Sequence, residues 1–263
     1  MTNPPPLYHE VHPGNGPYLL LVHGFLMSRA QWQPNLAALS AVCRPVVVEL
    51  PGHARSPAPE DPGAYTPAAL AASLDTIRAS LGVERWFLCG YSLGAGLTLR
   101  YALTWPQRVL AQAFTNSTSA LADAAQQAAW REGGENSRLK FIEQGHAAID
   151  RIAVHPRHAK RLPEVVKTPL LDDAATHSPL GIANVMAYTT PEISVRDLVA
   201  RNSVPTLLIQ GMRETRFAPF AEFARSHMPN LEVAELDTGH GVNMEDADAF
   251  NSALANFLAR YRP

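Results

Sequence analysis

The chain has 263 residues, of which 46% are hydrophobic and 17% charged, and its formal net charge is −2. This composition is typical of a globular domain with a full core, and the nearly balanced charge argues against nucleic acid or an anionic membrane as a partner. No apolar stretch approaches the ~18 residues of a membrane span, and residues 1–6 lack the pattern of a signal peptide, so we expect a cytoplasmic protein with no membrane partner.

Short apolar runs alternate with longer amphipathic segments along most of the chain. This alternation is typical of β-α-β units and indicates a mostly parallel sheet covered by helices on both faces. The predicted strands are Tyr18–Val22, Pro45–Glu49, Arg85–Cys89, Leu110–Thr115, Thr206–Gln210 and Leu231–Leu236, with Tyr8–His12 as an edge strand. The predicted helices between them are Trp32–Ser40, Pro67–Leu81, Leu93–Leu103 and Glu245–Tyr261.

A tight turn, His23-Gly24-Phe25, follows the strand that begins at Tyr18. Its backbone can present the amide of Phe25 to a negatively charged oxygen, as a tetrahedral acyl intermediate requires. The alternative is an ordinary tight turn with no role in binding. Next along the chain, Cys43 and later Cys89 lie in apolar surroundings, and we predict that both are buried free thiols.

The sequence Gly90-Tyr91-Ser92-Leu93-Gly94 has the G-x-S-x-G pattern. It follows a predicted strand and opens a predicted helix, which is the context that a strained turn exposing a nucleophilic serine requires. We therefore predict that Ser92 is a nucleophile and that the amide of Leu93, at the helix N-terminus, is a second oxyanion donor. The alternative is a glycine-rich turn with an idle serine.

Residues 117–200 contain no convincing strand, and a structureless loop of that length is improbable in a compact domain. We predict a helical cap, or lid, inserted in a core formed by residues 1–116 and 201–263. Its predicted helices are Leu121–Arg131, Ser137–His155, Glu164–Thr176 and Leu180–Tyr188. The cap also carries a basic run, Arg151, Arg157, Lys160 and Arg161. This run indicates either a solvated helix face or capture of an anionic group.

The remaining catalytic candidates follow the last two strands. His240 lies in a glycine-flanked loop after Leu231–Leu236, where its ring can reach Ser92 as a general base. Glu214 follows Thr206–Gln210, at the sheet edge where a carboxylate that orients the base belongs. Two alternatives to Glu214 stay open: Asp237 as the acid, or a surface ion pair of Glu214 with a neighbouring arginine. His155-x-x-His158 has no third ligand at a suitable spacing, so we expect no metal site.

With these motifs in place, the chain resembles the α/β-hydrolase fold family from about residue 17 to 258, outside the cap. The segment Val48-Glu49-Leu50-Pro51-Gly52-His53-Ala54-Arg55-Ser56 is similar to the D-L-P-G-H-G-x-S loop of that family. Within the family, the motifs around His23, Ser92 and Glu214 look most like those of one branch. This branch contains the menaquinone-pathway synthases that eliminate pyruvate, and esterases similar to them. In that branch an arginine binds the substrate carboxylate at the position where this chain has Gly96.

We therefore expect a serine hydrolase that cleaves a carboxylic ester, lactone or related acyl substrate through an acyl-enzyme, without cofactor or metal, as a monomer or homodimer. The alternative activity is a pyruvate-eliminating lyase with the same triad, and a remote one is a non-catalytic receptor for a small ligand. The residues expected to contact the substrate are His23, Tyr91, Met212, Phe217 and Val242.

Overall fold

The computed structural model describes residues 4–263, so the first three residues of the N-terminal segment lie outside the description. A seven-stranded sheet forms its centre, in the order β1-β3-β2-β4-β5-β6-β7. Strand β1 runs antiparallel to β3, and all other neighbouring strands of this sheet run parallel. The strands are β1 His9–Val11, β2 Tyr18–Val22, β3 Arg44–Val48, β4 Trp86–Gly90, β5 Val109–Thr115, β6 Thr206–Gly211 and β7 Leu231–Leu236.

The predicted strands are confirmed, and no end moves by more than one residue. Short apolar runs identify them well because the inner strands β2, β4, β5 and β6 are buried almost throughout. The edge strand β7 has no fully buried residue: Glu232 and Glu235 are exposed and its other residues are half-buried.

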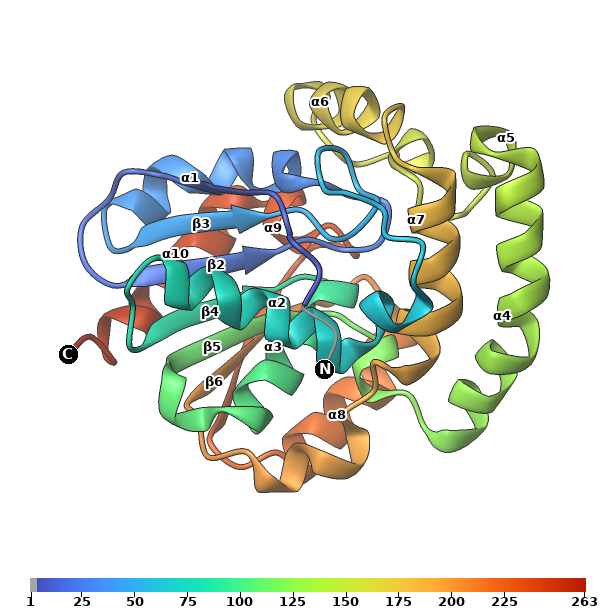
Figure 1. Ribbon diagram of the computed structural model, residues 1–263. Coiled ribbons are helices and arrows are strands. Elements are labelled where there is room, and N and C mark those ends of the chain that lie inside the picture. Colours follow the sequence, from blue (N-terminus) through green and yellow to red (C-terminus); the bar gives the residue numbers. More distant parts are fainter. Residues whose placement is uncertain (1–3) are drawn as a thin grey trace.

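Helices cover both faces of the sheet (Figure 1). Successive residues of β2 point to opposite faces: Leu19 and Leu21 pack in one core with α10, and Leu20 and Val22 pack in the other with α2 and α3. The longer helices of these layers are α1 Gln33–Ser40, α2 Pro67–Ser80, α3 Leu93–Thr104, α8 Ala218–His227 and α10 Ala247–Ala259. Thr66 and Pro67 begin α2 as predicted, with the Thr66 hydroxyl accepting from the Ala69 amide.

The final predicted helix, Glu245–Tyr261, corresponds to α10, and a short helix that was not predicted, α9 Val242–Glu245, precedes it. Asp246 separates them, because its side chain accepts from the Ala249 amide and caps α10. Short 3-10 turns connect the longer elements: η1 Arg29–Trp32, η2 Pro62–Tyr65, η3 Pro106–Arg108, η4 Ser119–Leu121, η5 Pro156–His158, η7 Thr190–Glu192, η8 Arg196–Arg201 and η9 Thr215–Phe217.

Between β5 and β6, residues 117–200 form helices and turns, and this fully described range contains no strand. We call these residues the helical segment. Its helices are α4 Ala124–Gln144, α5 His146–Ile149, α6 Glu164–Ala174, α7 Pro179–Asn184 and the π-helical turn η6 Val185–Thr189. In Figure 1 they lie beyond the carboxyl ends of the strands, on the side to which the arrows point.

The predicted boundaries within the helical segment are partly wrong. Helix α4 continues through Gly133 and Gly134, where the sequence predicts a break, and it ends at Gln144. A capping box at Asp123 begins it. Gly134 is buried against η6, where a Cβ would lie 3.6 Å from Ala187 Cα, an ordinary van der Waals contact.

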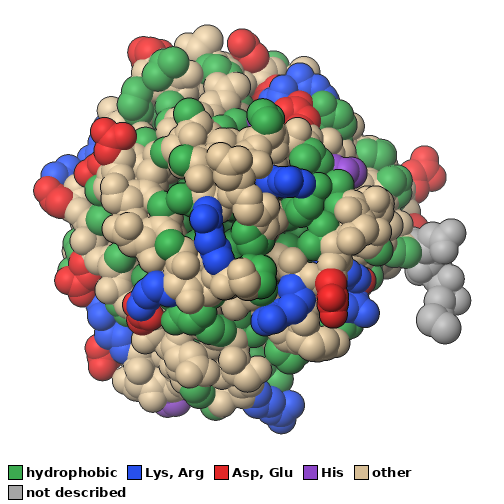
Figure 2. Space-filling view, turned by 90° about the vertical axis from the view of Figure 1, so that its left-hand side faces the viewer, with side chains coloured by type: hydrophobic (Ala, Val, Ile, Leu, Met, Phe, Trp, Pro, Cys, Tyr) green, Lys and Arg blue, Asp and Glu red, His purple; other side chains and the backbone are tan. Residues whose placement is uncertain are grey.

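Acidic and basic side chains are interspersed with hydrophobic ones on the face shown in Figure 2, which fits the small net charge of the chain. Cys43 and Cys89 are buried free thiols, as predicted.

Candidate functional site

Ser92 lies at the turn between β4 and α3, with φ 51° and ψ −115°. A positive φ is rare for a residue with a side chain. Glycines make the turn sterically possible: a Cβ on Gly90 would lie 2.4 Å from the Gly94 carbonyl oxygen, and one on Gly94 would lie 2.3 Å from that of Val22. The turn therefore holds the Ser92 hydroxyl at the carboxyl end of the sheet, beside the N-terminus of α3.

Ser92, His240 and Glu214 come from three separate loops and form one chain of hydrogen bonds. His240 Nε2 lies 3.1 Å from Ser92 Oγ, and His240 Nδ1 lies 2.8 Å from Glu214 Oε2. A carboxylate only accepts hydrogen bonds, so Nδ1–H donates to Glu214 and Nε2 is left to accept from the Ser92 hydroxyl. In this arrangement the imidazole can take the serine proton.

Glu214 is held in its ionised form. Burial by itself raises its pKa, but hydrogen bonds from His240 and Asn116 and the charges of His240 and Arg216 outweigh burial, so the pKa lies below its ordinary value. Asn116 Nδ2 donates to Glu214 Oε2 at 2.8 Å and to the Gly211 carbonyl at 2.9 Å. The sequence analysis missed this role of Asn116, whose position directly after β5 was the available signal.

The two alternatives to Glu214 do not fit the geometry. The Asp237 side chain is 80% exposed and accepts from Arg213 Nε at 2.6 Å, so it does not contact His240. Arg213 is thereby paired with Asp237 instead of Glu214.

Phe25 and Leu93 both lie near Ser92: a Cβ on Gly24, the neighbour of Phe25, would lie 3.1 Å from Ser92 Cβ, and Leu93 follows Ser92 as the first residue of α3. Within residues 4–263, neither amide donates a hydrogen bond, although the amides on both sides of Phe25 do: Gly24 N to Gln31 Oε1 at 3.1 Å and Leu26 N to His53 Nε2 at 3.2 Å. These two N–H groups are available to an external acceptor.

Three buried histidines surround this loop. His23 Nε2 accepts from the Leu50 amide and Nδ1–H donates to the Gly24 carbonyl, so the prediction that His23 contacts substrate is wrong. His177 Nδ1 accepts from the Ala54 amide. Burial lowers the pKa of His23 to about 3 and that of His177 to about 4, and it lowers the pKa of His53 well below its ordinary value. All three are therefore neutral structural groups at pH 7.

A cavity of about 710 Å³ opens at Ser92 and His240, a suitable size for a small-molecule substrate. Of the other residues predicted to contact substrate, Tyr91 lines this cavity, whereas Met212, Phe217 and Val242 do not. Phe217 and Val242 are fully buried in two separate hydrophobic clusters, and Met212 is 46% exposed. The apolar lining comes mainly from residues that the sequence analysis missed: Met27, Ala153, Val154, Leu162, Phe220 and Met244.

Two further findings concern cofactors and membranes. In the described part of the chain, no three His, Cys, Asp or Glu side chains are grouped to hold a metal ion. His155 and His158 instead contact Asp150 through its carboxylate and its carbonyl oxygen. None of the helices within residues 4–263 is both long and apolar enough to span a bilayer.

Comparison with known proteins identifies the family of the chain. A family model described as "alpha/beta hydrolase fold" matches residues 17–247, and the chain belongs to this family. "Putative carbamate hydrolase RutD" of Variovorax paradoxus is 30% identical, with 97% of each chain covered. "Carboxylesterase YbfK" of Bacillus subtilis is 27% identical, with 94% of this chain and 81% of that protein covered. The structure of MenH from S. aureus superimposes with a TM-score of 0.85 at 19% identity, covering 97% of this chain and 98% of that one. The chain is thus an enzyme of the α/β-hydrolase family.

Proposed function

We propose that this enzyme is a serine hydrolase that cleaves a carboxylic ester, lactone or related small acyl substrate through an acyl-enzyme. The observation that carries the proposal is the hydrogen-bonded chain from Ser92 through His240 to Glu214 at the base of the cavity. Relatives named as a carbamate hydrolase and a carboxylesterase support the same type of chemistry. The two buried free thiols fit a reducing compartment such as the cytoplasm.

In this mechanism, Ser92 Oγ attacks the substrate carbonyl carbon while His240 Nε2 takes the hydroxyl proton. The amides of Phe25 and Leu93 stabilise the resulting oxyanion. The tetrahedral intermediate collapses, and His240 returns the proton to the leaving group. A water molecule then attacks the acyl-enzyme, with His240 again as the base. Glu214 keeps the imidazole in the required tautomer and stabilises its cationic form.

The residue at position 96 argues against the pyruvate-eliminating lyase activity. The lyase branch has a carboxylate-binding arginine near the start of α3, and this chain has Gly96 there. A Cβ on Gly96 would already lie 2.5 Å from Ile193 Cγ1, so no longer side chain fits that position without displacing Ile193.

We further infer that the helical segment acts as a cap with residues 117–200 as its bounds. Most residues from 153 to 162, though not Pro156 or Arg157, line the cavity that contains Ser92 and His240, which supports a role in choosing the substrate.

The proposal is tested by labelling with a fluorophosphonate and by hydrolysis of p-nitrophenyl butyrate. We expect one label per chain, on Ser92, and a burst of p-nitrophenol from acyl-enzyme formation. Ser92→Ala should lose both. Ser119→Ala removes another serine of the cavity and should still be labelled on Ser92. Labelling that persists in Ser92→Ala contradicts the role of Ser92 as the nucleophile. A chain that is neither labelled nor active on esters contradicts the proposal and favours the receptor. Pyruvate release from the synthase substrate, with ester cleavage at background, favours the lyase.

A further inference from the structure

Three cationic side chains line the cavity that contains Ser92: Lys160, Arg161 and Arg216. The first two come from the helical segment, between η5 and α6, and the third comes from η9 of the core. Within residues 4–263, none of the three forms an ion pair or a hydrogen bond. Arg157, which does not line the cavity, instead pairs with Asp150 at 2.8 Å.

Within residues 4–263, neither carboxylate of the cavity forms an ion pair with these cations. Glu214 accepts from His240 and Asn116, as described above. Glu245 accepts from the Gly239 amide at 2.8 Å and from the Gly241 amide at 3.2 Å. The cavity lining therefore carries three cationic side chains and two carboxylates, and this excess of positive charge attracts an anion.

Arg161 lies close to the catalytic histidine loop. A Cβ on Gly239, the residue before His240, would lie 3.1 Å from Arg161 Nη1. Arg216 lies two residues after Glu214, and its charge helps to lower the pKa of that carboxyl. Arg161 and Arg216 therefore border the catalytic loops. The apolar part of the lining includes Met27, Leu162, Phe220 and Met244, and polar residues such as Ser119 and Gln126 line the rest.

We propose that Lys160, Arg161 and Arg216 form a carboxylate subsite, so that the enzyme acts on acyl substrates with an apolar body and a carboxylate at the far end of the acyl chain. This inference rests on the proposed hydrolase function and assigns a substrate class to it. The subsite is formed between the helical segment and the core, and it is separate from the Gly96 position at which the lyase branch carries its arginine.

The test compares two esters with the same leaving group, p-nitrophenyl butyrate and mono-p-nitrophenyl glutarate. We expect kcat/KM to be about tenfold higher or more for the glutarate ester at low salt, and the ratio to fall as NaCl is raised to 0.5 M. Arg161→Gln, Arg216→Gln and Lys160→Gln should each lower the ratio, roughly threefold to tenfold. Arg157→Gln, the matched control, should leave it unchanged. A ratio near one, or one that the three variants do not change, overturns the proposal.

Direct binding separates this proposal from the hydrolase function itself. Glutarate should bind to Ser92→Ala in isothermal titration and bind more weakly when Arg161→Gln is added. If no ester is cleaved but glutarate binds in this Arg161-dependent manner, the hydrolase function is wrong and the carboxylate subsite stands. If esters are cleaved, but glutarate does not bind and the glutarate ester is not cleaved faster than the butyrate ester, the hydrolase function stands and the carboxylate subsite is wrong.

A second, independent observation concerns the loop that carries the Phe25 amide. The next residue, Leu26, has φ 60°, which is strained for a residue with a Cβ. Both polar atoms of its backbone are held by histidines: Leu26 N donates to His53 Nε2 at 3.2 Å, and the Leu26 carbonyl accepts from His177 Nε2–H at 3.3 Å. His177 belongs to the helical segment.

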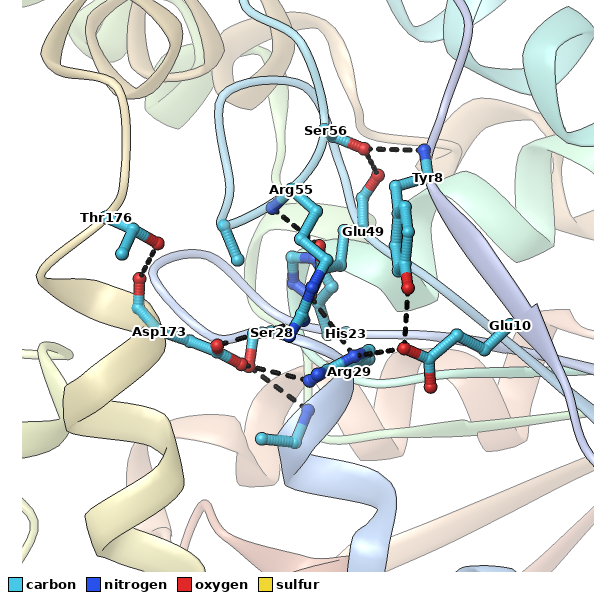
Figure 3. A network of polar contacts seen from close by, with 12 residues as sticks. Tyr8, Glu10, His23, Ser28, Arg29, Glu49, Arg55, Ser56, Asp173 and Thr176 are labelled. Atoms are coloured by element: carbon cyan, nitrogen blue, oxygen red, sulfur yellow. Dashed lines mark hydrogen bonds and ion pairs between the residues drawn. The ribbon is translucent and has the colours of Figure 1, made fainter.

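Asp173 on α6 holds the same loop from its other end. Figure 3 shows its carboxylate directed at Ser28 and Arg29, and Asp173 Oδ2 accepts from Ser28 Oγ at 2.7 Å and from Arg29 Nη1 at 3.2 Å. Arg29 in turn donates to Glu10 at 2.7 Å, which connects the loop to β1. We propose that Asp173 and His177 are positioning residues that hold the Phe25 amide in place for the oxyanion, which again rests on the proposed function.

His177→Asn and His177→Gln test the two hydrogen bonds of the His177 imidazole one at a time. Asn reaches the Nδ1 position and retains the bond from Ala54, but it has no group that reaches the Leu26 carbonyl, whereas the Gln amide reaches the Nε2 position. We expect kcat and the affinity for butylboronic acid, which mimics the tetrahedral intermediate, to fall together by about tenfold in His177→Asn and Asp173→Asn. His177→Gln should restore both in part.

The matched control is Asp172→Asn, an exposed carboxylate on the same helix, which should change neither quantity. A lowered stability with unchanged kcat and unchanged boronate affinity in His177→Asn and Asp173→Asn overturns the positioning role. If Asp173→Asn does not fold, Ser28→Ala removes the same hydrogen bond from the other partner. Failure of the hydrolase function is recognised separately, because the unaltered enzyme then neither cleaves the ester nor binds the boronate.

Discussion

His23, His53 and His177 should make the folded chain sensitive to mild acid. In each ring one nitrogen accepts from a backbone amide, of Leu50, Leu26 and Ala54 respectively, so protonation removes an acceptor as well as burying a charge. Between pH 7.5 and 5.0 the unfolded chain takes up protons at these imidazoles and the folded chain does not. Because the unfolded state then binds more protons, the free energy of unfolding falls as the pH falls.

The size of this loss follows from the lowered pKa values. The pKa of His23 is lowered from 6.5 to about 3 and that of His177 to about 4, so both stay neutral in the folded chain at pH 5.0. At that pH each costs about 2 kcal/mol relative to pH 7.5, at about 1.4 kcal/mol per pH unit below 6.5. Together they remove about 4 kcal/mol, a large share of the 5–15 kcal/mol typical of a folded domain. His53 acts in the same direction.

Two carboxylates with shifted pKa values also affect how stability depends on pH. The pKa of Glu214 is lowered, so its contribution to stability is lost only below about pH 4.5, the ordinary value for an unfolded glutamate. The pKa of Glu49 is raised, chiefly by burial, so its protonation in the folded state opposes part of the loss.

Urea unfolding at pH 7.5, 6.5, 5.5 and 5.0 measures the effect, with the slope on urea checked for constancy. His177→Gln should reduce the loss of stability between pH 7.5 and 5.0 by about 2 kcal/mol, because glutamine does not titrate. His227→Gln, which removes an exposed imidazole, is the control and should not change the loss. Equal stability at pH 7.5 and 5.0 would falsify the assignment of these histidines as buried neutral groups.

Two further predictions follow from the site and the helices. Glu214→Gln should lower kcat for ester hydrolysis by about 10² to 10⁴, because an amide can stabilise the wrong tautomer of His240 and cannot stabilise its cation. Asp237→Asn should leave kcat unchanged. The opposite result for the two variants would identify Asp237 as the acid. Gly90→Ala should destabilise or unfold the chain, since its Cβ would lie 2.3 Å from Thr98 Oγ1. Gly133→Ala, with no atom within 4 Å of its Cβ, should raise stability by about 0.5–1 kcal/mol in thermal or urea unfolding; a loss of stability there contradicts our account of α4.

Much of the framework could be predicted because local patterns carry it. Buried parallel strands must be short and apolar, so each run was recognisable and its ends moved by at most one residue. The turn at Ser92 needs glycines two residues before and after the serine for steric reasons that do not depend on the rest of the chain. Breaks inside helices were harder, because Gly133-Gly134 weakens a helix locally, yet the packing of α4 against η6 keeps it continuous.

The sequence by itself determined the strands, the strained serine turn and the order of the candidate serine, acid and base, since each depends on neighbouring residues in the chain. Only the tertiary structure decided which carboxylate meets His240, that Asn116 supports it, and that His23 is a structural group instead of a substrate contact. It also brought cations of the helical segment and the core into one cavity. The physical reason is that contacts between distant segments depend on how the loops at the sheet edge fold over one another, and no local pattern of residue types specifies that arrangement.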